Sequence, residues 1–243
     1  MNKPDRFWDT PLIFSPSLIC LDPCNLESQV RLLERAGIET LHIDLIDGHF
    51  SPSMPLGLET VRALRKKTRL RFDAHVMAEN NGFFIKELLD TGVDQLIFHI
   101  ETEKHPDAAL TAIKNSGVRA GVALKPSTPL SVLEYVIEKC DTVMLMLINP
   151  GYAGTSGEKQ VPYAERKVGD LRRFISERKL PVKIELDGRI SRENIARYGT
   201  GPADIFVIGS TCLSRDRMEA DLRQLQELRA RMTAENTGPG ESL

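Results

Sequence analysis

Short apolar runs alternate with amphipathic stretches along most of the chain. The runs have the length and apolar content of buried strands, and apolar residues in the stretches between them recur at helical spacing. The pattern predicts strands at residues 12–20, 39–47, 70–77, 95–101, 119–125, 142–148, 181–187 and 205–209. It predicts helices at residues 25–36, 58–67, 82–91, 106–116, 130–140, 162–178, 192–198 and 216–232.

Alternation of eight strands with eight helices predicts an α/β fold, a single (β/α)8 TIM barrel with a parallel eight-stranded barrel. The length of 243 residues fits one such domain, because barrels of this type have about 250 residues. We expect the barrel to span residues 12–234. A polar leader at residues 1–11 precedes it, and residues 235–243, which lack an apolar pattern, are expected to form a flexible tail.

Composition narrows the function classes. The net charge is −2, and basic residues are interspersed with acidic ones, which disfavours nucleic-acid and membrane-surface partners. No segment approaches the roughly 20 apolar residues that span a bilayer, and the start of the chain lacks the apolar core of a signal peptide. We therefore expect a cytoplasmic protein. The four cysteines are scattered in mostly apolar contexts, which favours reduced, buried thiols.

Histidine and carboxylate side chains recur at the carboxyl ends of three predicted strands. His42 and Asp44 share one face of their strand, because alternate residues of a strand point the same way. His75 and Asp187 end two further strands. If these ends meet, two nitrogen and two oxygen ligands suit one divalent metal ion, such as zinc, iron(II), manganese or cobalt. Each residue alone is more often a structural group, but recurrence at strand ends favours a metal site.

Glycine-bearing turns follow the last three predicted strands. Barrel enzymes often hold a substrate phosphate there, because glycine lets backbone N–H groups approach the anion closely. Each turn alone is weak evidence, but three in one sector of a barrel favour a phosphate site. Ser210 could add a hydroxyl, and Arg189 either adds a charge or is a solvated surface group. The candidate phosphate-binding residues are Gly151, Gly154, Gly188, Arg189, Gly209 and Ser210.

Six motifs, in the same order, resemble the ribulose-phosphate 3-epimerase family between Ile13 and Leu213. They are Pro16-Ser17-Leu18, His42-Ile43-Asp44 with Asp47-Gly48-His49-Phe50, His75-Val76-Met77, Asn149-Pro150-Gly151-Tyr152-Ala153-Gly154, Glu185-Leu186-Asp187-Gly188 and Gly209-Ser210.

The resemblance implies a (β/α)8 barrel that epimerises a phosphorylated ketose with one divalent metal. It implies that His42, Asp44, His75 and Asp187 ligate the metal and that Asp44 and Asp187 form the acid/base pair. It places Ser17 beside the substrate, Met77 and Met146 beneath the reacting carbons, and Gly188, Gly209 and Ser210 at the phosphate. It also implies a homo-oligomer, either a dimer or a hexamer.

Departures from the family pattern leave the sugar open. Lys125 replaces a usual asparagine, Thr155 a usual glutamine, and Arg189 the second glycine of Asp-Gly-Gly. Ile46 stands where a third pocket methionine is usual. The segment Ser17-Leu18-Ile19-Cys20-Leu21-Asp22 resembles the allulose-6-phosphate 3-epimerase branch. The substrate is therefore expected to be of the ribulose 5-phosphate or allulose 6-phosphate type.

Other interpretations remain open. Epimerase-like proteins of the Lsr operons imply a phosphorylated autoinducer-2-type dihydroxypentanedione as an alternative substrate. Related phosphosugar decarboxylases and hexulose-phosphate synthases carry Asp-x-Lys-x-x-Asp on strand three, whereas this chain has Asp73-Ala74-His75 without the lysine. A non-catalytic sugar-phosphate-binding paralogue is disfavoured, because all four presumed ligands are present. We expect His49, His99 and His105 to be structural or surface residues, and Glu101 to contact substrate or support a ligand.

Overall fold

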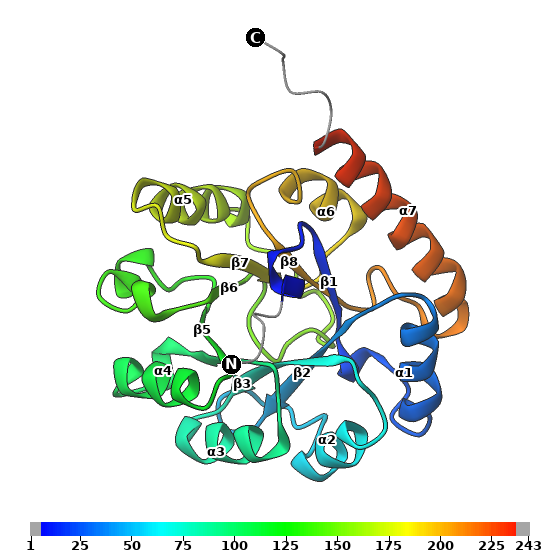
Figure 1. Ribbon diagram of the computed structural model, residues 1–243, viewed down its shortest axis with the longest axis horizontal. Helices are drawn as coiled ribbons and strands as arrows, with labels where there is room; N and C mark the ends of the chain where they lie inside the picture. The colour runs from blue at the N-terminus through cyan, green and yellow to red at the C-terminus, as the bar shows by residue number, and fades with distance from the viewer. Residues whose placement is uncertain (1–5, 237–243) are drawn as a thin grey trace.

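Eight parallel strands form one sheet in the computed structural model, which describes residues 6–236. Neighbouring strands follow the order β1-β8-β7-β6-β5-β4-β3-β2, and an isolated parallel bridge between Ser17 and His42 joins the first strand to the second. The strands form the central ring in Figure 1, which confirms the predicted barrel. Their bounds are β1 (Ile13–Pro16), β2 (Thr40–Ile46), β3 (Arg71–Met77), β4 (Gln95–His99), β5 (Arg119–Leu124), β6 (Thr142–Met146), β7 (Lys183–Asp187) and β8 (Ile205–Ile208).

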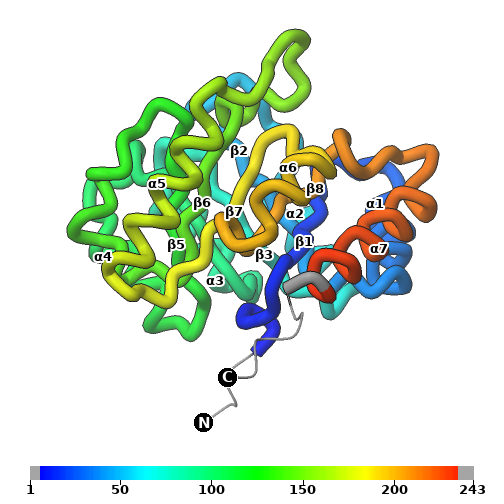
Figure 2. The backbone as a smooth tube through the Cα atoms, turned by 90° about the horizontal axis from the view of Figure 1, so that it is seen from above, coloured from blue at the N-terminus to red at the C-terminus, as the bar shows by residue number. Residues whose placement is uncertain are grey.

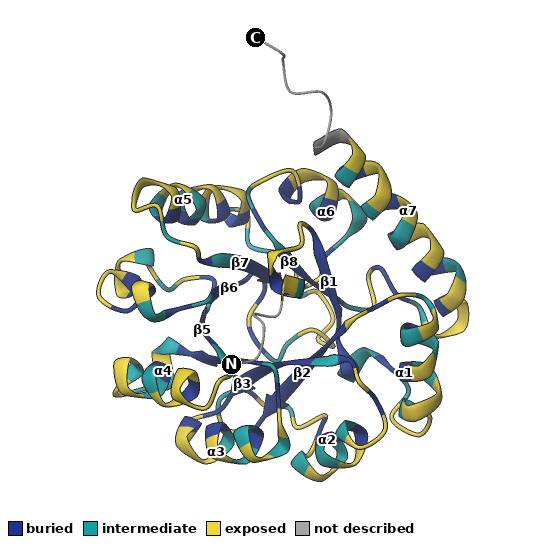
Figure 3. Cartoon of the chain, in the orientation of Figure 1, coloured by how far each residue is buried: buried dark blue, intermediate teal, exposed yellow. Residues whose placement is uncertain are grey.

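Helices surround this ring and turn their apolar faces toward it. In the first helix Val30 and Leu33 are buried, and Figure 3 shows the same division between inner and outer faces around the barrel. The helices are α1 (Leu26–Arg35), α2 (Leu58–Arg65), α3 (Asn81–Thr91), α4 (Pro106–Asn115), α5 (Ala164–Glu177), α6 (Arg192–Tyr198) and α7 (Met218–Asn236).

The helix predicted at residues 130–140 is wrong. This segment forms two short 3-10 helices, η4 (Leu130–Leu133) and η5 (Ile137–Lys139), so the described residues contain seven α-helices. Leu133, Val136 and Ile137 are buried, and residues 134–136 form a turn that separates the two 3-10 helices. Branched side chains such as Val136 also lower the preference for an α-helix.

The other 3-10 helices lie near strand ends and helix starts. They are η1 (Arg6–Asp9), η2 (Leu18–Cys20), η3 (Ile100–Thr102) and η6 (Arg215–Arg217). The first predicted strand is therefore shorter than expected, because the chain turns into η2 after β1. The predicted tail begins inside α7, and its residues 237–243 lie outside the described part of the chain.

Side chains fill the interior of the barrel. Trp8 of η1 packs with Ile13 and Ile205 at the amino ends of the strands, and the Arg119 guanidinium lies 5.1 Å from the Trp8 ring. The leader therefore contributes a buried aromatic residue despite its polar composition. A separate apolar cluster lies nearer the carboxyl ends of the strands and consists of Ile97, Ala123, Met144, Met146 and Val207. At the carboxyl ends, the connection from β6 to α5 projects away from the barrel (Figure 2).

Two predictions about cysteines and membranes can be compared with the structure. Cys140 and Cys212 are buried as expected, whereas Cys20 is half-buried and Cys24 is exposed. All four thiols are free, which agrees with the prediction of reduced cysteines. No helix among residues 6–236 is both long enough and apolar enough to cross a bilayer.

Candidate active site

A cavity of about 560 Å³ opens at the carboxyl ends of the strands. The predicted site residues that line it are Ser17, Asp44, Met77, Met146, Gly151, Gly154, Asp187, Arg189, Gly209 and Ser210. His42 and His75 are fully buried beside Asp44 and do not line the cavity. The structure therefore brings the residues expected at the metal and at the phosphate into one place.

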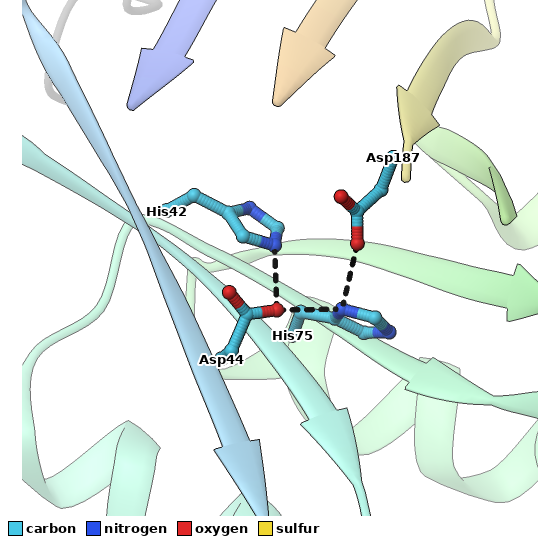
Figure 4. A group of neighbouring side chains, drawn as sticks. All are labelled: His42, Asp44, His75 and Asp187. Carbon is cyan, nitrogen blue, oxygen red and sulfur yellow. Dashed lines mark hydrogen bonds and ion pairs between the residues drawn. The ribbon is translucent and has the colours of Figure 1, made fainter. Parts of the chain in front are cut away.

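Four side chains from three strands converge at this cavity (Figure 4). Strand register places Asp44 of β2 directly opposite His75 of β3. Oδ1 of Asp44 lies 3.2 Å from Nε2 of His42 and 3.2 Å from Nδ1 of His75. Oδ2 of Asp187, on β7, lies 3.9 Å from the same His75 nitrogen. One ligand atom from each residue lies within 4.8 Å of the other three, as binding of a single metal ion requires.

The two carboxylates of this cluster have pKa values shifted in opposite directions. Burial would raise the pKa of Asp44, but the charges and hydrogen bonds of His42 and His75 outweigh burial and hold that pKa below its usual range. Burial raises the pKa of Asp187, and the neighbouring Asp44 charge raises it further. Ser17 donates a hydrogen bond of 2.7 Å to Oδ2 of Asp44, which stabilises the ionised form. The site therefore favours ionisation of Asp44 over ionisation of Asp187.

His42 has the arrangement of a metal ligand. Its Nδ1 lies 2.9 Å from Oδ2 of Asp73, and a ring held in this way directs its other nitrogen away from the carboxylate. That Nε2 atom is buried and faces Oδ1 of Asp44 at 3.2 Å, but it has no hydrogen-bond geometry with any described residue. Burial would lower the pKa of His42, but the Asp44 and Asp73 charges raise the pKa well above its usual value. A buried nitrogen that makes no hydrogen bond and lies beside two carboxylates is suitably placed to bind a cation in the cluster.

A second polar layer lies next to His42 and was missed by the sequence analysis. Gln95 donates hydrogen bonds to Oδ1 of Asp73 at 2.8 Å and to Oε2 of Glu185 at 3.0 Å. Ser15 donates to Oδ2 of Asp73. Burial and the Asp73 charge raise the pKa of Glu185 well above its usual value, which favours its protonated form. Asp73 of this layer supports His42 through its contact with Nδ1.

The alternation of side chains along a strand could have predicted where these missed residues lie. Asp73 lies two positions before His75, and Glu185 lies two positions before Asp187, so each pair shares a strand face. The rule that pairs His42 with Asp44 therefore also directs Asp73 and Glu185 into the barrel.

His99 is buried, but it is more than a surface or isolated structural residue. Its Nε2 lies 3.1 Å from Nε2 of His75, and its Nδ1 lies 2.9 Å from Oε2 of Glu101. Burial lowers the pKa of His99 to about 4, although the hydrogen bond to Glu101 opposes this shift. Burial would raise the pKa of Glu101, but hydrogen bonds and the charge of His99 lower it to about 2. Glu101 therefore supports a candidate ligand through His99.

The predicted phosphate-binding residues divide into two groups. Gly151, Gly154, Arg189, Gly209 and Ser210 line the cavity, whereas Gly188 does not. Gly188 has a φ of 109°, and a Cβ atom there would lie 2.8 Å from Cγ1 of Ile148. Glycine is therefore required at this position by the sharp turn after β7, and a direct contact with phosphate stays a prediction.

Two arginines line the same cavity. Arg189 has a φ of 50°, and its guanidinium donates hydrogen bonds to the carbonyl oxygens of Ala153 and Thr155. These bonds tie the turn after β7 to the projecting connection after β6. Arg215 was not predicted, and its Nε donates to the carbonyl oxygen of Cys20 at 3.0 Å. Both side chains bring positive charge to the cavity, which Gly209 and Ser210 also line.

Solved structures share this barrel. KGPDC from Streptococcus mutans aligns with a TM-score of 0.66 at 13% identity, covering 92% of this chain and 100% of that chain. The 3-hexulose-6-phosphate synthase from Salmonella typhimurium aligns with a TM-score of 0.63 at 16% identity, covering 92% and 100%. At these identities the likeness shows the fold alone.

Sequence comparison is more specific. The chain matches the model of the Ribulose-phosphate 3 epimerase family over residues 13–213. Ribulose-phosphate 3-epimerase from Treponema pallidum is 36% identical over 82% of this chain and 90% of its own. Its counterpart from Methanocaldococcus jannaschii is 32% identical over 87% and 88%. The chain therefore belongs to the ribulose-phosphate 3-epimerase family, isomerases with carbohydrate-phosphate 3-epimerase activity.

Proposed function

We propose that the protein is a metal-dependent 3-epimerase of a phosphorylated ketose, of the ribulose 5-phosphate or allulose 6-phosphate type. The observation that carries the proposal is the convergence of His42, Asp44, His75 and Asp187 at one cavity, with their ligand atoms within 4.8 Å of one another. Similarity to named ribulose-phosphate 3-epimerases supports the same reaction class.

One divalent ion would be held by His42 and His75 through nitrogen and by Asp44 and Asp187 through oxygen. Zinc, iron(II), manganese and cobalt all suit this donor set. The unpaired Nε2 of His42 and the closely spaced carboxylates fit such an ion. When bound, the ion supplies positive charge that stabilises the negative charge developing on the substrate oxygens.

Proton transfer is assigned to the two aspartates. Asp44, whose pKa is held low, accepts the proton from carbon 3 of one epimer, and the electron pair of the C–H bond moves into an enediolate. Asp187, whose pKa is raised, then donates its proton to carbon 3 from the opposite face. The carbonyl forms again and the configuration at carbon 3 is inverted. In the reverse direction the two residues exchange roles.

Other cavity residues are proposed to position the substrate. Met77 and Met146 provide an apolar surface beneath the reacting carbons, and Ser17 lies beside them through its hydrogen bond to Asp44. Gly209 and Ser210 would hold the phosphate, with Gly151 and Gly154 allowing a close approach of the loop after β6.

Positive charge in the cavity favours a phosphorylated substrate. Arg189 and Arg215 both line the cavity, and an arginine guanidinium binds phosphate oxygens with directed hydrogen bonds. Of the other departures from the family pattern, Ile46 also lines the cavity, whereas Lys125 and Thr155 do not. Arg189 is therefore the charged departure through which the chain would select among phosphorylated ketoses.

The test is incubation of metal-loaded protein with D-ribulose 5-phosphate and D-allulose 6-phosphate, separately, in D2O. NMR would follow epimer formation and deuterium entry at carbon 3. We expect both signals with one of the two sugars, and their loss after the metal is removed with a chelator. Silence with both sugars would contradict the proposal and favour a phosphorylated dihydroxypentanedione or a non-catalytic binding role. A cytoplasmic location and a homo-oligomeric assembly stay predictions.

A further inference from the structure

A chain of three polar side chains extends from the candidate metal centre to the loop after β5. His75 contacts no carboxylate through Nε2, which instead lies 3.1 Å from Nε2 of His99. Nδ1 of His99 lies 2.9 Å from Oε2 of Glu101 in η3. Both rings are completely buried, and their centroids are 5.1 Å apart. Among residues 6–236, the ring nitrogens on this side therefore have hydrogen-bond partners in each other and in Glu101.

The hydrogen bonds of Glu101 determine which nitrogen of His99 carries a hydrogen. Oε1 of Glu101 accepts from the backbone N–H of Lys125 at 2.6 Å and from the hydroxyl of Thr128. An ionised carboxylate only accepts, so Oε2 accepts the Nδ1–H of His99. A neutral imidazole carries one N–H, which leaves a lone pair on Nε2 of His99.

The same reasoning determines the tautomer of His75. The lone pair on Nε2 of His99 requires a donor, and the atom facing it is Nε2 of His75. If Nε2 of His75 carries the hydrogen, its Nδ1 carries a lone pair. That Nδ1 atom lies 3.2 Å from Asp44 and 3.9 Å from Asp187, inside the candidate metal centre. Because Nδ1 also lies within hydrogen-bond distance of the Asp44 carboxylate, this tautomer is the one that the ring adopts when a metal ion takes the Nδ1 lone pair.

We propose that Glu101 and His99 are positioning residues that hold His75 in the Nε2–H tautomer, with its Nδ1 lone pair directed at the metal. The inference rests on the proposed function, because it concerns the same metal centre. His42 receives its support directly from Asp73, whereas His75 receives it through a second imidazole. Supporting residues of this kind orient a ligand and strengthen its binding to metal.

The surroundings keep this chain of hydrogen bonds in place. The ring of Phe50 lies 4.6 Å from that of His99, and Nζ of Lys125 lies 4.1 Å above the Phe50 ring. Nζ of Lys167 donates to the carbonyl oxygens of Lys125 and Pro126. These contacts fix the loop that supplies two donors to Glu101, and they cover the buried rings.

The first measurement needs no substitution. In zinc-loaded protein with 15N-labelled histidine, the ring-nitrogen shifts of His75 report its tautomer. We expect a protonated Nε2 and an unprotonated Nδ1, and the opposite tautomer would overturn the proposal. The second measurement is the affinity for Zn2+, from competition with a chelator, in Glu101→Ala, Glu101→Gln and His99→Phe. Glu103→Gln, a half-buried carboxylate two residues away that accepts from the backbone N–H of His105, serves as the matched control.

We expect Glu101→Ala and His99→Phe to weaken Zn2+ binding by roughly 10- to 100-fold, the range seen for residues that support a ligand. Glu101→Gln should recover part of the affinity, because an amide oxygen still accepts a hydrogen bond. Wild-type affinity in Glu101→Ala would overturn the proposal. Neither measurement uses a sugar. If both give the expected result but the protein epimerises no sugar, the proposed function is refuted and the role of Glu101 and His99 is not.

Discussion

Asp44 and Asp187 line the same cavity, yet the protein shifts their pKa values in opposite directions. His42 and His75 lower the pKa of Asp44 despite its burial, whereas burial and the charge of Asp44 raise the pKa of Asp187. Two carboxyl groups with pKa values shifted apart suit a reaction that removes one proton and returns another.

Replacement of either aspartate should therefore stop epimerisation. We expect Asp44→Asn and Asp187→Asn each to lower kcat by roughly 100- to 10,000-fold, the usual contribution of a proton-transfer group. The measurement is epimer formation together with metal content, since both residues are also candidate ligands. Asp90→Asn, an exposed position on α3, is the control. More than about a tenth of wild-type turnover in either variant would refute the two-base assignment.

Arg189 occupies backbone geometry that glycine adopts more easily, with a φ of 50°. Lys179, with a φ of 54°, is an exposed matched control that does not line the cavity. We expect Lys179→Gly to raise the free energy of unfolding by up to about 1 kcal/mol without changing KM. Arg189→Gly should gain less stability, because its bonds to Ala153 and Thr155 are lost.

The same Arg189→Gly variant should also raise KM for the phosphorylated substrate by roughly tenfold, as expected for one lost charge-assisted hydrogen bond. Steady-state kinetics and urea unfolding of both glycine variants provide the comparison. An unchanged KM in Arg189→Gly would show that the guanidinium holds the loop but does not bind substrate.

Two glycines near the cavity should respond differently to alanine. A Cβ atom at Gly188 would lie 2.8 Å from Cγ1 of Ile148 and 2.9 Å from its backbone nitrogen, at a φ of 109°. Gly188→Ala should lower the free energy of unfolding by about 2 to 4 kcal/mol, because a backbone clash adds to conformational strain. Gly154 has nothing within 4 Å of the corresponding position, so Gly154→Ala should stay within about 0.5 kcal/mol. Similar unfolding curves for both variants would contradict this difference.

Glu101 should make stability depend on pH in the acidic range. Its pKa falls from an ordinary value of 4.5 to about 2 in the folded protein, and its side chain is only 17% exposed. A lowered folded-state pKa stabilises the protein above pH 4.5, and this contribution is lost as the pH falls toward 2. At pH 3 the loss is on the order of 2 kcal/mol. Urea unfolding of metal-free protein at pH 7, 4 and 3 should show a smaller decline in Glu101→Gln than in wild type, and parallel declines would disprove this account.

The barrel and the candidate ligands could be predicted from local patterns. Alternation within a strand directs His42 and Asp44 to one side, and the parallel arrangement of strands places His75 and Asp187 at the same end. These are consequences of backbone geometry, and they hold wherever the strands pair. Asp73 and Glu185 followed from the same rule but were overlooked.

Contacts between distant segments required the tertiary structure. The contact of His75 with His99 depends on how two neighbouring strands pack in the barrel, and the opposite pKa shifts of the aspartates depend on burial and nearby charges. Packing also decided that residues 130–140 form 3-10 turns and that Trp8 closes the barrel. The sequence by itself determined which side chains reach the site, because strand periodicity is local. The tertiary structure decided their partners and protonation, because these depend on residues that are distant along the chain.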